Sequence, residues 1–429
     1  MRYNIFVMNE KNGNFATIYR TVIVGGGAAG LCAAVTLKKA APNLKVRLLE
    51  SLPRVGKKLA ATGNGRCNIT NKNITAERYH GLHPEFCLYA LQKYDNKCCE
   101  DFFNSIGVPF VYEGDKAYPA SLQAASVVDC LRFAAEEYGV VVCTETKVTN
   151  IQVSGGSYKV IAGNMSFLAD NIVIAAGLLS GGEKLGNDGS MLALLKKAGF
   201  KTVETHPAIV QLKTRPDIVR QLKGIKVNAS AALKQGKRVL KSEYGEVLFC
   251  DYGLSGPPIL QLSGAVGSEK NITVSLDLVS NKDFNMLSEV LFNRAKRLKN
   301  RTLDEFFTGM LNKRLGQVII KSAGLRLNDK AESLKKADIL KITALLKDMS
   351  FEVTGNTGYI NSQVTGGGLD TSGFDCNTMM SREYNGLYAI GEILDIDGDC
   401  GGFNLKWAWS SAMCAAFDIV KRSNNAFNK

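Results

Sequence analysis

Residues 21–50 constrain the fold of this chain more than any other stretch. They begin with the apolar run Thr-Val-Ile-Val, continue through Gly-Gly-Gly-Ala-Ala-Gly into an Ala- and Leu-rich run, and end after Pro42 with a second apolar run and Glu50. This order predicts a strand, a glycine-rich turn, a helix, a second strand and a carboxylate. The same order is typical of a βαβ unit that binds a dinucleotide.

Each glycine of this turn has a physical role in such a unit. Gly25 allows the tight exit from the strand, Gly27 removes a side chain where a pyrophosphate approaches the backbone, and Gly30 lets the helix pack closely on the sheet. The helix begins at Ala28 and Ala29, where unpaired N–H groups attract a phosphate. The alternative is a purely structural turn.

Glu50 lies at the end of the second strand, twenty residues after Gly30. A carboxylate there accepts hydrogen bonds from the ribose hydroxyls of an adenosine. The acid therefore favours FAD or NAD over a nucleotide that carries a 2′-phosphate.

The 429 residues predict two or three domains, and the hydrophobic fraction of 45% with 22% charged residues is ordinary for a globular protein. No run of eighteen apolar residues occurs, so no membrane span is expected. Residues 1–20 lack the apolar core of a signal peptide, and we interpret them as an extension before the first strand.

Cysteine and histidine usage indicates a cytoplasmic protein without a metal site. The eleven cysteines are odd in number and scattered, and no C-x-x-C motif occurs. This pattern fits reduced thiols and argues against a dithiol flavoenzyme. Only three histidines occur, so a histidine-based metal centre is not expected.

Residues 56–71 are rich in glycine and basic residues and are predicted to form a loop beside the nucleotide. Glycines there permit close backbone approach, and cations balance a pyrophosphate. A flexible surface loop is the alternative. We interpret Cys67 as a packing or flavin-contact residue, because no histidine lies near it in sequence to activate it. The candidate cofactor residues of this loop are Lys58, Gly63, Gly65, Arg66, Cys67 and Asn68.

The middle of the chain changes texture twice. Residues 84–139 are predicted to be mainly helical, and short strands follow, including 147–153 with Val148 and 171–177, which ends at Ala176 and Gly177. Those three residues are further cofactor candidates. Residues 203–279 predict a small antiparallel barrel or sandwich, and residues 283–349 predict helices.

The last eighty residues return to the texture of the first. A strand at 386–392 ends in glycine and an acid, then acidic and Gly-Gly residues lead into an Ala-rich helix at 405–420. The acid can hold ribityl or ribose hydroxyls, and the helix N-terminus can stabilise charge on a reduced flavin. A plain strand followed by a packed helix is the alternative. The candidates are Gly391, Glu392, Asp397, Gly401, Gly402, Phe403 and Asn404.

Several motifs together resemble the BaiN/YhiN-like bacterial flavoproteins, a family of NAD(P)/FAD-dependent oxidoreductases. The resemblance rests on VIVGGGAAG (22–30), GNGRCNITN (63–71), GLSGP (253–257), GEILD (391–395) and GGFNL (401–405). It implies bound FAD that NADH or NADPH reduces, and most members have no assigned substrate. Our leading hypothesis is hydride transfer through flavin N5 to an unsaturated small molecule. One branch of the family reduces carbon–carbon double bonds in bile-acid intermediates.

The resemblance also implies an α/β fold. A Rossmann-like FAD-binding domain of the glutathione-reductase type is expected at 18–199 and 353–429. It is split by an inserted β-barrel subdomain at 200–281 and an inserted helical subdomain at 282–352.

The sequence departs from the family before GLSGP, where Cys250 and Asp251 replace an expected Thr-His pair. Histidine-dependent proton transfer is therefore not expected from that loop, and bile-acid chemistry is not carried over. The catalytic acid or base stays unassigned. Its candidates are Asp251, Tyr252, Ser255 and Asp397.

Two other functions remain open. Residues 201–350 contain 26 Lys and Arg against 15 Asp and Glu, which accounts for most of the net charge of +13. The dense clusters at 234–241 and 294–301 could bind RNA, although no aromatic residues are interleaved with them and a solvated surface is the ordinary explanation. A flavin-binding protein without turnover is the third possibility.

Overall fold

The computed structural model of the chain consists of two units and describes residues 6–8, 15–154, 156–266 and 271–427. Unit 1 comprises Met1–Pro207 and Gln363–Lys429, and unit 2 comprises Ala208–Ser362. Much of the extension expected at residues 1–20 lies outside the described residues. Its described part belongs to strands, because β1 is Phe6–Met8 and β2, Phe15–Val24, begins before residue 21.

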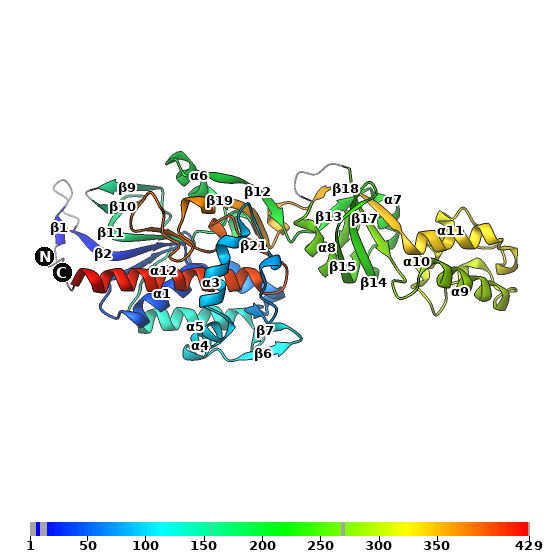
Figure 1. The fold of residues 1–429 in the computed structure, drawn as a ribbon, viewed down its shortest axis with the longest axis horizontal. Helices are drawn as coiled ribbons and strands as arrows, with labels where there is room; N and C mark the ends of the chain where they lie inside the picture. Colours follow the sequence, from blue (N-terminus) through cyan, green and yellow to red (C-terminus); the bar gives the residue numbers. More distant parts are fainter. Residues whose placement is uncertain (1–5, 9–14, 155, 267–270, 428–429) are drawn as a thin grey trace. The chain divides into compact units, whose positions relative to one another are not determined.

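Within the described residues, an eight-stranded sheet forms the centre of unit 1 (Figure 1). Its parallel part has the order β8-β3-β2-β11-β20, and β10, β9 and β1 extend it in antiparallel fashion. A parallel sheet of this kind confirms the Rossmann-like α/β fold. The remaining strand bounds are β3 Val46–Leu49, β8 Val141–Cys143, β9 Asn150–Ser154, β10 Ser157–Ala162, β11 Met165–Ile174 and β20 Leu387–Ala389.

The carboxyl ends of the parallel strands are level with one another. Val24 pairs with Leu49 and with Ile174, Leu49 pairs with Cys143, and Ile174 pairs with Ala389. The residues that follow each strand therefore meet at one edge of the sheet, although they come from both ends of the chain. In open α/β sheets, this edge is where ligands bind.

Helices α1, Ala28–Ala40, α5, Ala124–Glu137, and α12, Phe403–Phe427, pack together beside this sheet (Figure 1). Small residues of α1 let it pack closely against α12. Trp407 and Trp409, near the N-terminus of α12, are fully buried. The other α-helices of unit 1 are α2 Lys57–Ala61, α3 Leu88–Lys93, α4 Asn96–Ser105 and α6 Ser190–Lys197.

Three small sheets complete unit 1 in the described part of the chain. They are β4-β7-β6, β5-β21 and β12-β19. Their strands are β4 Thr70–Asn71, β5 Tyr79–His80, β6 Phe110–Glu113, β7 Lys116–Pro119, β12 Thr202–Ala208, β19 Val364–Leu369 and β21 Asp397–Gly398.

One local expectation was wrong. The segment 56–71 is not a continuous loop, because Lys-Lys-Leu-Ala-Ala forms α2 before Gly63 and Asn64 break it with φ of 58° and 54°. The segment 84–139 is mainly helical, as expected, and strands β6 and β7 form a hairpin within it. A tight turn at Gly114, with φ of 59°, makes that hairpin possible.

Unit 2 is a closed barrel with helices at one end. The barrel order is β13-β16-β15-β14-β17-β18. Its strands are β13 Leu212–Thr214, β14 Lys226–Gln235, β15 Arg238–Phe249, β16 Gly253–Ser255, β17 Ile272–Asp277 and β18 Met349–Asn356. The helices are α7 Pro216–Val219, α8 Pro257–Ser263, α9 Phe284–Arg297, α10 Lys313–Ser322 and α11 Lys336–Lys347.

The boundaries of unit 2 differ from the divisions expected at 199/200, 281/282 and 352/353. Strand β18 follows the helices in sequence but pairs with β13 and β17, so the barrel closes only with residues from both sides of the helical segment. Barrel and helices also share one apolar core, which includes Val274, Leu291 and Phe306.

Candidate functional site

The glycine-rich turn places an open helix N-terminus at the level edge of the sheet, which is the edge where the carboxyl ends of the parallel strands meet. Gly25 has a φ of +107°, and a Cβ there would lie 2.4 Å from the carbonyl oxygen of Ala175. A Cβ on Gly30 would lie 1.9 Å from the carbonyl oxygen of Gly25, whereas one on Gly27 would meet no atom within 4 Å. Gly25 and Gly30 are therefore needed for packing, and Gly27 faces open space.

Among the described residues, no side chain caps the first N–H groups of α1. Gly27 is the N-cap without a side-chain hydrogen bond, and the first turn, which includes Ala28 and Ala29, contains no acidic residue. Free N–H groups at a helix N-terminus are the groups that bind a phosphate.

Glu50 follows β3 at this edge and is buried, with 9% of its surface exposed. Its Oε2 accepts a hydrogen bond of 2.8 Å from the Gly26 N–H, and its Oε1 accepts one of 2.8 Å from the Leu52 N–H. The carboxylate thus fixes the glycine-rich turn and keeps further lone pairs for another donor. Its contact with a ribose stays a prediction.

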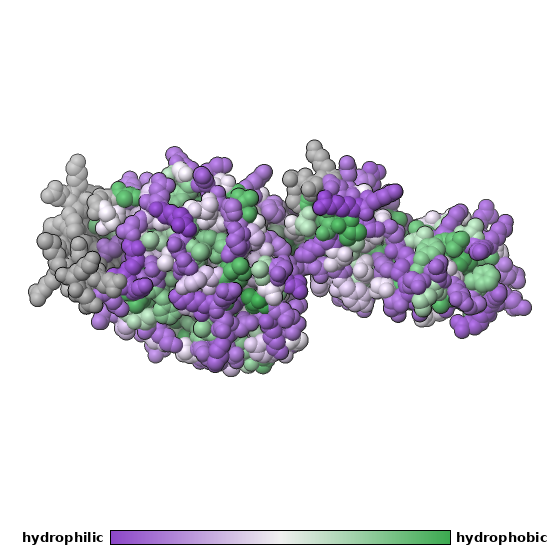
Figure 2. All heavy atoms as spheres, viewed as in Figure 1, coloured by the Kyte–Doolittle hydropathy of each residue, from purple (hydrophilic) through white to green (hydrophobic). Residues whose placement is uncertain are grey.

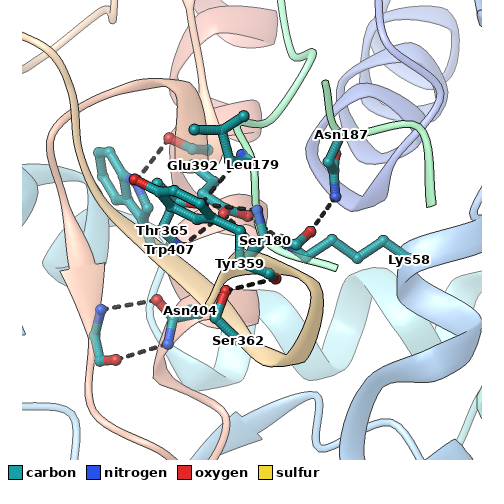
Figure 3. Close-up of polar contacts among 12 residues, drawn as sticks. Lys58, Leu179, Ser180, Asn187, Tyr359, Ser362, Thr365, Glu392, Asn404 and Trp407 are labelled. Atoms are coloured by element: carbon teal, nitrogen blue, oxygen red, sulfur yellow. Dashed lines mark hydrogen bonds and ion pairs between the residues drawn. The ribbon is translucent and has the colours of Figure 1, made fainter. Parts of the chain in front are cut away.

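Lys58 and Glu392, from opposite ends of the chain, form an ion pair at the same edge (Figure 3). Lys58 Nζ also donates to Ser180 Oγ, and Ser180 Oγ donates to Glu392 Oε1 over 2.6 Å. The Thr365 N–H donates to the same oxygen over 3.0 Å. The pair is therefore one part of a polar network that joins α2, the turn after β11, β19 and the turn after β20.

Thr365 and Ser180 are site residues that the sequence did not reveal. Thr365 Oγ1 accepts hydrogen bonds from the N–H groups of Leu179 and Ser180, at 3.1 and 2.9 Å (Figure 3). Asn187 Nδ2 donates to the Ser180 carbonyl over 2.6 Å. The one signal in the sequence is the Gly-Gly pair after Ser180, which indicates a turn close to other parts of the chain.

The N-terminus of α12 is covered by residues 66–71. A Cβ on Gly402, whose φ is +100°, would lie 2.6 Å from the Thr70 carbonyl oxygen and 2.8 Å from Asn68 Oδ1. Asn71 Nδ2 donates to the Gly401 carbonyl over 2.9 Å. Asn68 Oδ1 is buried and has no hydrogen-bond partner among the described residues.

Asn404 and Phe403 hold the segment that leads into α12. The Asn404 amide accepts from the Gly398 N–H over 2.8 Å and donates to the Gly398 carbonyl over 2.7 Å (Figure 3). The Phe403 ring meets the Tyr79 ring edge to face at 6.1 Å. These contacts give both residues a structural role, whatever else they bind.

The remaining predicted cofactor residues divide into three environments. Ala176 and Gly177 follow β11 at the level edge, and Gly391 lies close to α1, since a Cβ on Gly391 would be 3.0 Å from the Ala29 Cβ. Gly63 and Gly65 adopt left-handed backbone conformations in the turn after α2. Val148 is buried in the apolar core of unit 1.

Two residues of the 66–71 segment, Arg66 and Cys67, make their contacts within the protein. Arg66 forms an ion pair with Glu113 and lies over the Tyr118 ring at 4.4 Å. Cys67 is buried, and burial raises the pKa of its thiol to about 12. A thiol with so high a pKa is not a nucleophile at neutral pH, which agrees with a packing role.

The four candidates for the acid or base do not share one unit. Asp251, Tyr252 and Ser255 belong to unit 2, where Asp251 forms an exposed ion pair of 2.7 Å with Lys223. Asp397 belongs to unit 1 and is buried in strand β21. Only Asp397 thus lies in the same unit as the predicted cofactor residues.

Within the described ranges, no cluster of His, Cys, Asp and Glu has the geometry of a metal site. In the same ranges, no helix combines the length and apolarity that a bilayer crossing requires.

Three observations indicate that the residues at the level edge suit a dinucleotide cofactor such as FAD. The N-terminus of α1 is open, Gly27 leaves space in front of it, and Asn68 Oδ1 is a buried acceptor without a partner in the described chain. A phosphate satisfies the first two, and an N–H group of a ligand satisfies the third.

Comparison with known proteins agrees with this geometry. The family model described as HI0933-like protein Rossmann domain matches residues 19–418. A 3-dehydro-bile acid delta(4,6)-reductase from Clostridium scindens is 32% identical over 407 residues, which cover 94% of this chain and 99% of the relative.

Two further matches differ in what they support. A ribosomal RNA dihydrouridine synthase from Haemophilus influenzae is 28% identical, over 94% of this chain and 98% of the relative. The solved structure of 3-ketosteroid delta1-dehydrogenase from Sterolibacterium denitrificans has a TM-score of 0.50 and 12% identity, over 94% of this chain and 100% of that one. The latter likeness concerns the fold alone.

Proposed function

Because the chain belongs to the HI0933-like protein family, whose members are FAD-dependent oxidoreductases, we propose that it reduces a carbon–carbon double bond in a small unsaturated molecule with electrons from NADH or NADPH. One observation supports this more than any other. Residues of the kinds that bind a dinucleotide, from 25–68 and from 391–404, meet at one edge of one sheet.

The residues of unit 1 would hold FAD as follows. The N–H groups at the start of α1 would bind the pyrophosphate, and Glu50 would accept hydrogen bonds from the adenosine ribose. Asn68 Oδ1 and the glycines before α12 would contact the isoalloxazine. Bound FAD would supply two-electron chemistry, in which a nicotinamide gives up hydride that the substrate then receives.

The Lys58, Ser180 and Glu392 network would position the ligand rather than react with it. Its charges are paired with each other, and its hydrogen bonds are already made inside the protein. Glu392 accepts from the Thr365 N–H and from Ser180 Oγ, so it would orient the neighbouring backbone.

A reductase is the favoured reaction because of the relative that reduces a bile-acid intermediate. Identity of 32% supports the reaction class and leaves the substrate open. The sequence has no second glycine-rich motif with its own acid, so the nicotinamide would reach the flavin directly. All eleven cysteines lie in described ranges and are free thiols, which suits a reducing cytoplasm.

The experiment has two halves. Purified protein is first loaded with FAD and mixed anaerobically with NADH or NADPH, and the loss of flavin absorbance is followed. The reduced protein is then mixed with 2-cyclohexen-1-one, with 4-androstene-3,17-dione and with a quinone. Reoxidation by the enones and a slower response to the quinone is the expected result. Protein that binds no FAD, or that no enone reoxidises, would contradict the proposal.

A second candidate is action on RNA, because a relative is a ribosomal RNA dihydrouridine synthase and unit 2 is basic. The structure places an exposed aromatic residue beside one of the basic clusters. Phe292 of α9 is 42% exposed, and Lys296 Nζ lies 4.4 Å from its ring centroid. Figure 2 shows hydrophobic residues among hydrophilic ones over α9 and α11. Exposed rings beside cations are suited to stacking on bases.

A gel-shift assay with ribosomal RNA at low and high salt tests this second function. Binding that weakens with salt, and that Phe292→Ala weakens further, would favour RNA over a free small molecule. Equal mobility at low salt with and without the protein would exclude it.

A further inference from the structure

Three aspartates of unit 1 occur at alternate positions before α12. Asp395, Asp397 and Asp399 are 1%, 6% and 5% exposed. Asp397 lies in strand β21, whereas Asp395 lies in a tight turn that the Ile396 N–H closes on the Leu394 carbonyl. Burying three acids together is costly unless positive charge or donors face them.

Two of the three acids are satisfied by the protein. Asp395 Oδ2 accepts a hydrogen bond of 2.7 Å from the Leu82 N–H. Asp399 forms an ion pair of 3.0 Å with Arg78 and a contact of 2.9 Å with His80 Nε2. Asp397 differs, since no hydrogen bond or ion pair to its carboxylate occurs among the described residues.

Asp397 faces a histidine from another strand. Gly366 of β19 lies between them: a Cβ on Gly366 would be 2.5 Å from His206 Nε2 and 3.3 Å from Asp397 Oδ1. The imidazole of β12 thus occupies the space that the missing side chain leaves, beside the buried carboxylate. No hydrogen bond to the His206 ring occurs among the described residues either.

We propose that His206 is the residue that donates the proton to the substrate, and that Asp397 positions its imidazole. This inference rests on the proposed function, because a proton is needed only if a double bond is reduced. It assigns the acid to a residue that was not among the four candidates from the sequence.

The atoms and electrons of the step balance. One carbon of the double bond receives hydride, which carries two electrons from the reduced flavin. The π electrons move to the other carbon, which forms a C–H bond as an N–H bond of the His206 imidazolium breaks. The product is a saturated bond and a neutral imidazole, which regains its proton from water while Asp397 stays ionised.

The charges around the pair determine its pH dependence. Burial raises the pKa of Asp397, and positive charge on His80 and His206 opposes that rise. The negative charges of Asp395 and Glu392, which precede it in sequence, raise the pKa of Asp397 further. Burial likewise raises the pKa of Asp395.

The three histidines of this chain allow a direct test by NMR. Protein labelled with ¹³Cε1-histidine gives one signal each for His80, His83 and His206, which single His→Gln variants assign. Asp397→Asn is expected to shift the signal of His206, because the carboxylate beside its imidazole is lost. His83, whose side chain is 45% exposed and lies beside Glu85, is the internal control. This readout needs neither cofactor nor substrate.

The same FAD-loaded variants are then compared in the two half-reactions. His206→Gln is expected to slow reoxidation by 2-cyclohexen-1-one at least about 100-fold and to leave reduction by the nicotinamide within about 3-fold. His83→Gln should behave as wild type in both. Gly366→Ala, which pushes the imidazole away and needs no unusual φ, is expected to give the same pattern if His206→Gln does not fold.

Two results would overturn the inference. One is a His206 signal that Asp397→Asn leaves unchanged, and the other is reoxidation of His206→Gln at the wild-type rate. Failure of the wild-type protein to react with any enone would instead contradict the proposed substrate class. The NMR spectra would then decide alone whether Asp397 acts on the His206 imidazole.

Discussion

Helices α1 and α12 both begin directly after glycines at the same edge of unit 1, but their N-termini are in opposite states. At α1, a Cβ on Gly27 would meet no atom within 4 Å, and the first turn contains no acid. At α12, a Cβ on Gly402 would lie 2.6 Å from the Thr70 carbonyl oxygen, and three buried aspartates precede the helix.

This difference separates two uses of one physical feature. An open N-terminus has N–H groups to give to an anion, as a pyrophosphate requires. A covered N-terminus has its position fixed by neighbouring backbone. A ligand there can be held by Asn68 Oδ1, which accepts a hydrogen bond from a ligand N–H. The glycines at the two sites are therefore expected to respond differently to the same substitution.

The largest expected effect separates folding from cofactor binding within the α1 turn. Gly30→Ala places a methyl group 1.9 Å from the Gly25 carbonyl oxygen, and we expect a loss of about 3 kcal/mol or more in the free energy of unfolding. Gly27→Ala should leave the apoprotein within about 0.5 kcal/mol of wild type, because its φ of −79° suits alanine. Its affinity for FAD should fall at least about 10-fold, or about 1.4 kcal/mol.

Urea unfolding of the apoproteins and titration with FAD measure the two quantities. Gly199→Ala, at a glycine where a Cβ would also meet no atom within 4 Å, is a control for distance from the turn, although its φ of +99° will cost some stability. If Gly27→Ala bound FAD as wild type does, the open N-terminus of α1 would not be the phosphate site.

The next effect concerns the covered N-terminus. Asn68→Leu removes a buried oxygen that lacks a partner, so the apoprotein should be as stable as wild type or gain about 1 kcal/mol. The FAD complex should be weakened, because the ligand loses an acceptor. Asn377→Leu, at an exposed position of unit 1, is the matched control.

Thermal unfolding with and without FAD measures both states of Asn68→Leu. A variant that destabilises the apoprotein as much as the complex would mean that Asn68 only supports the fold of residues 66–71.

A smaller effect is expected at the network that joins the two ends of the chain. Lys58→Met leaves the partly buried Glu392 without its cation, which should cost about 1–2 kcal/mol in the apoprotein. Lys57→Met, at the exposed neighbouring position, should cost less than about 0.5 kcal/mol. Urea unfolding at low and high salt compares them. Equal costs for both variants would show that the ion pair contributes nothing.

Local sequence patterns were enough to predict the parts of unit 1 that depend on neighbouring residues. Gly25, Gly30 and Glu50 act within one βαβ unit, so their spacing carries the information. The return of the chain at residues 386–404 was also predictable, because a strand that ends in glycine and an acid precedes a helix there.

Contacts between distant segments could not be predicted in the same way. His206 meets Asp397 only because β12 lies beside β19 and Gly366 has no side chain. The low number of histidines had been used only to exclude a metal site. The closing strand of the barrel, Met349–Asn356, was assigned to other domains because its partners lie more than seventy residues away in sequence.

The smallest effect tests the acids that precede α12 and have no counterpart at α1. Because burial raises the pKa of Asp397, the folded protein binds a proton there more tightly than the unfolded chain does. Its contribution to stability is therefore complete at low pH and is lost as pH rises through the raised pKa. Wild type should lose stability relative to Asp397→Asn as pH rises from about 4 to 7, the region above the ordinary aspartate pKa. Urea unfolding of both apoproteins at several pH values measures this, with the exposed Asp101→Asn as a control that should show no such trend. A wild type that instead gained on Asp397→Asn with rising pH would mean that the positive charges of His80 and His206 outweigh burial.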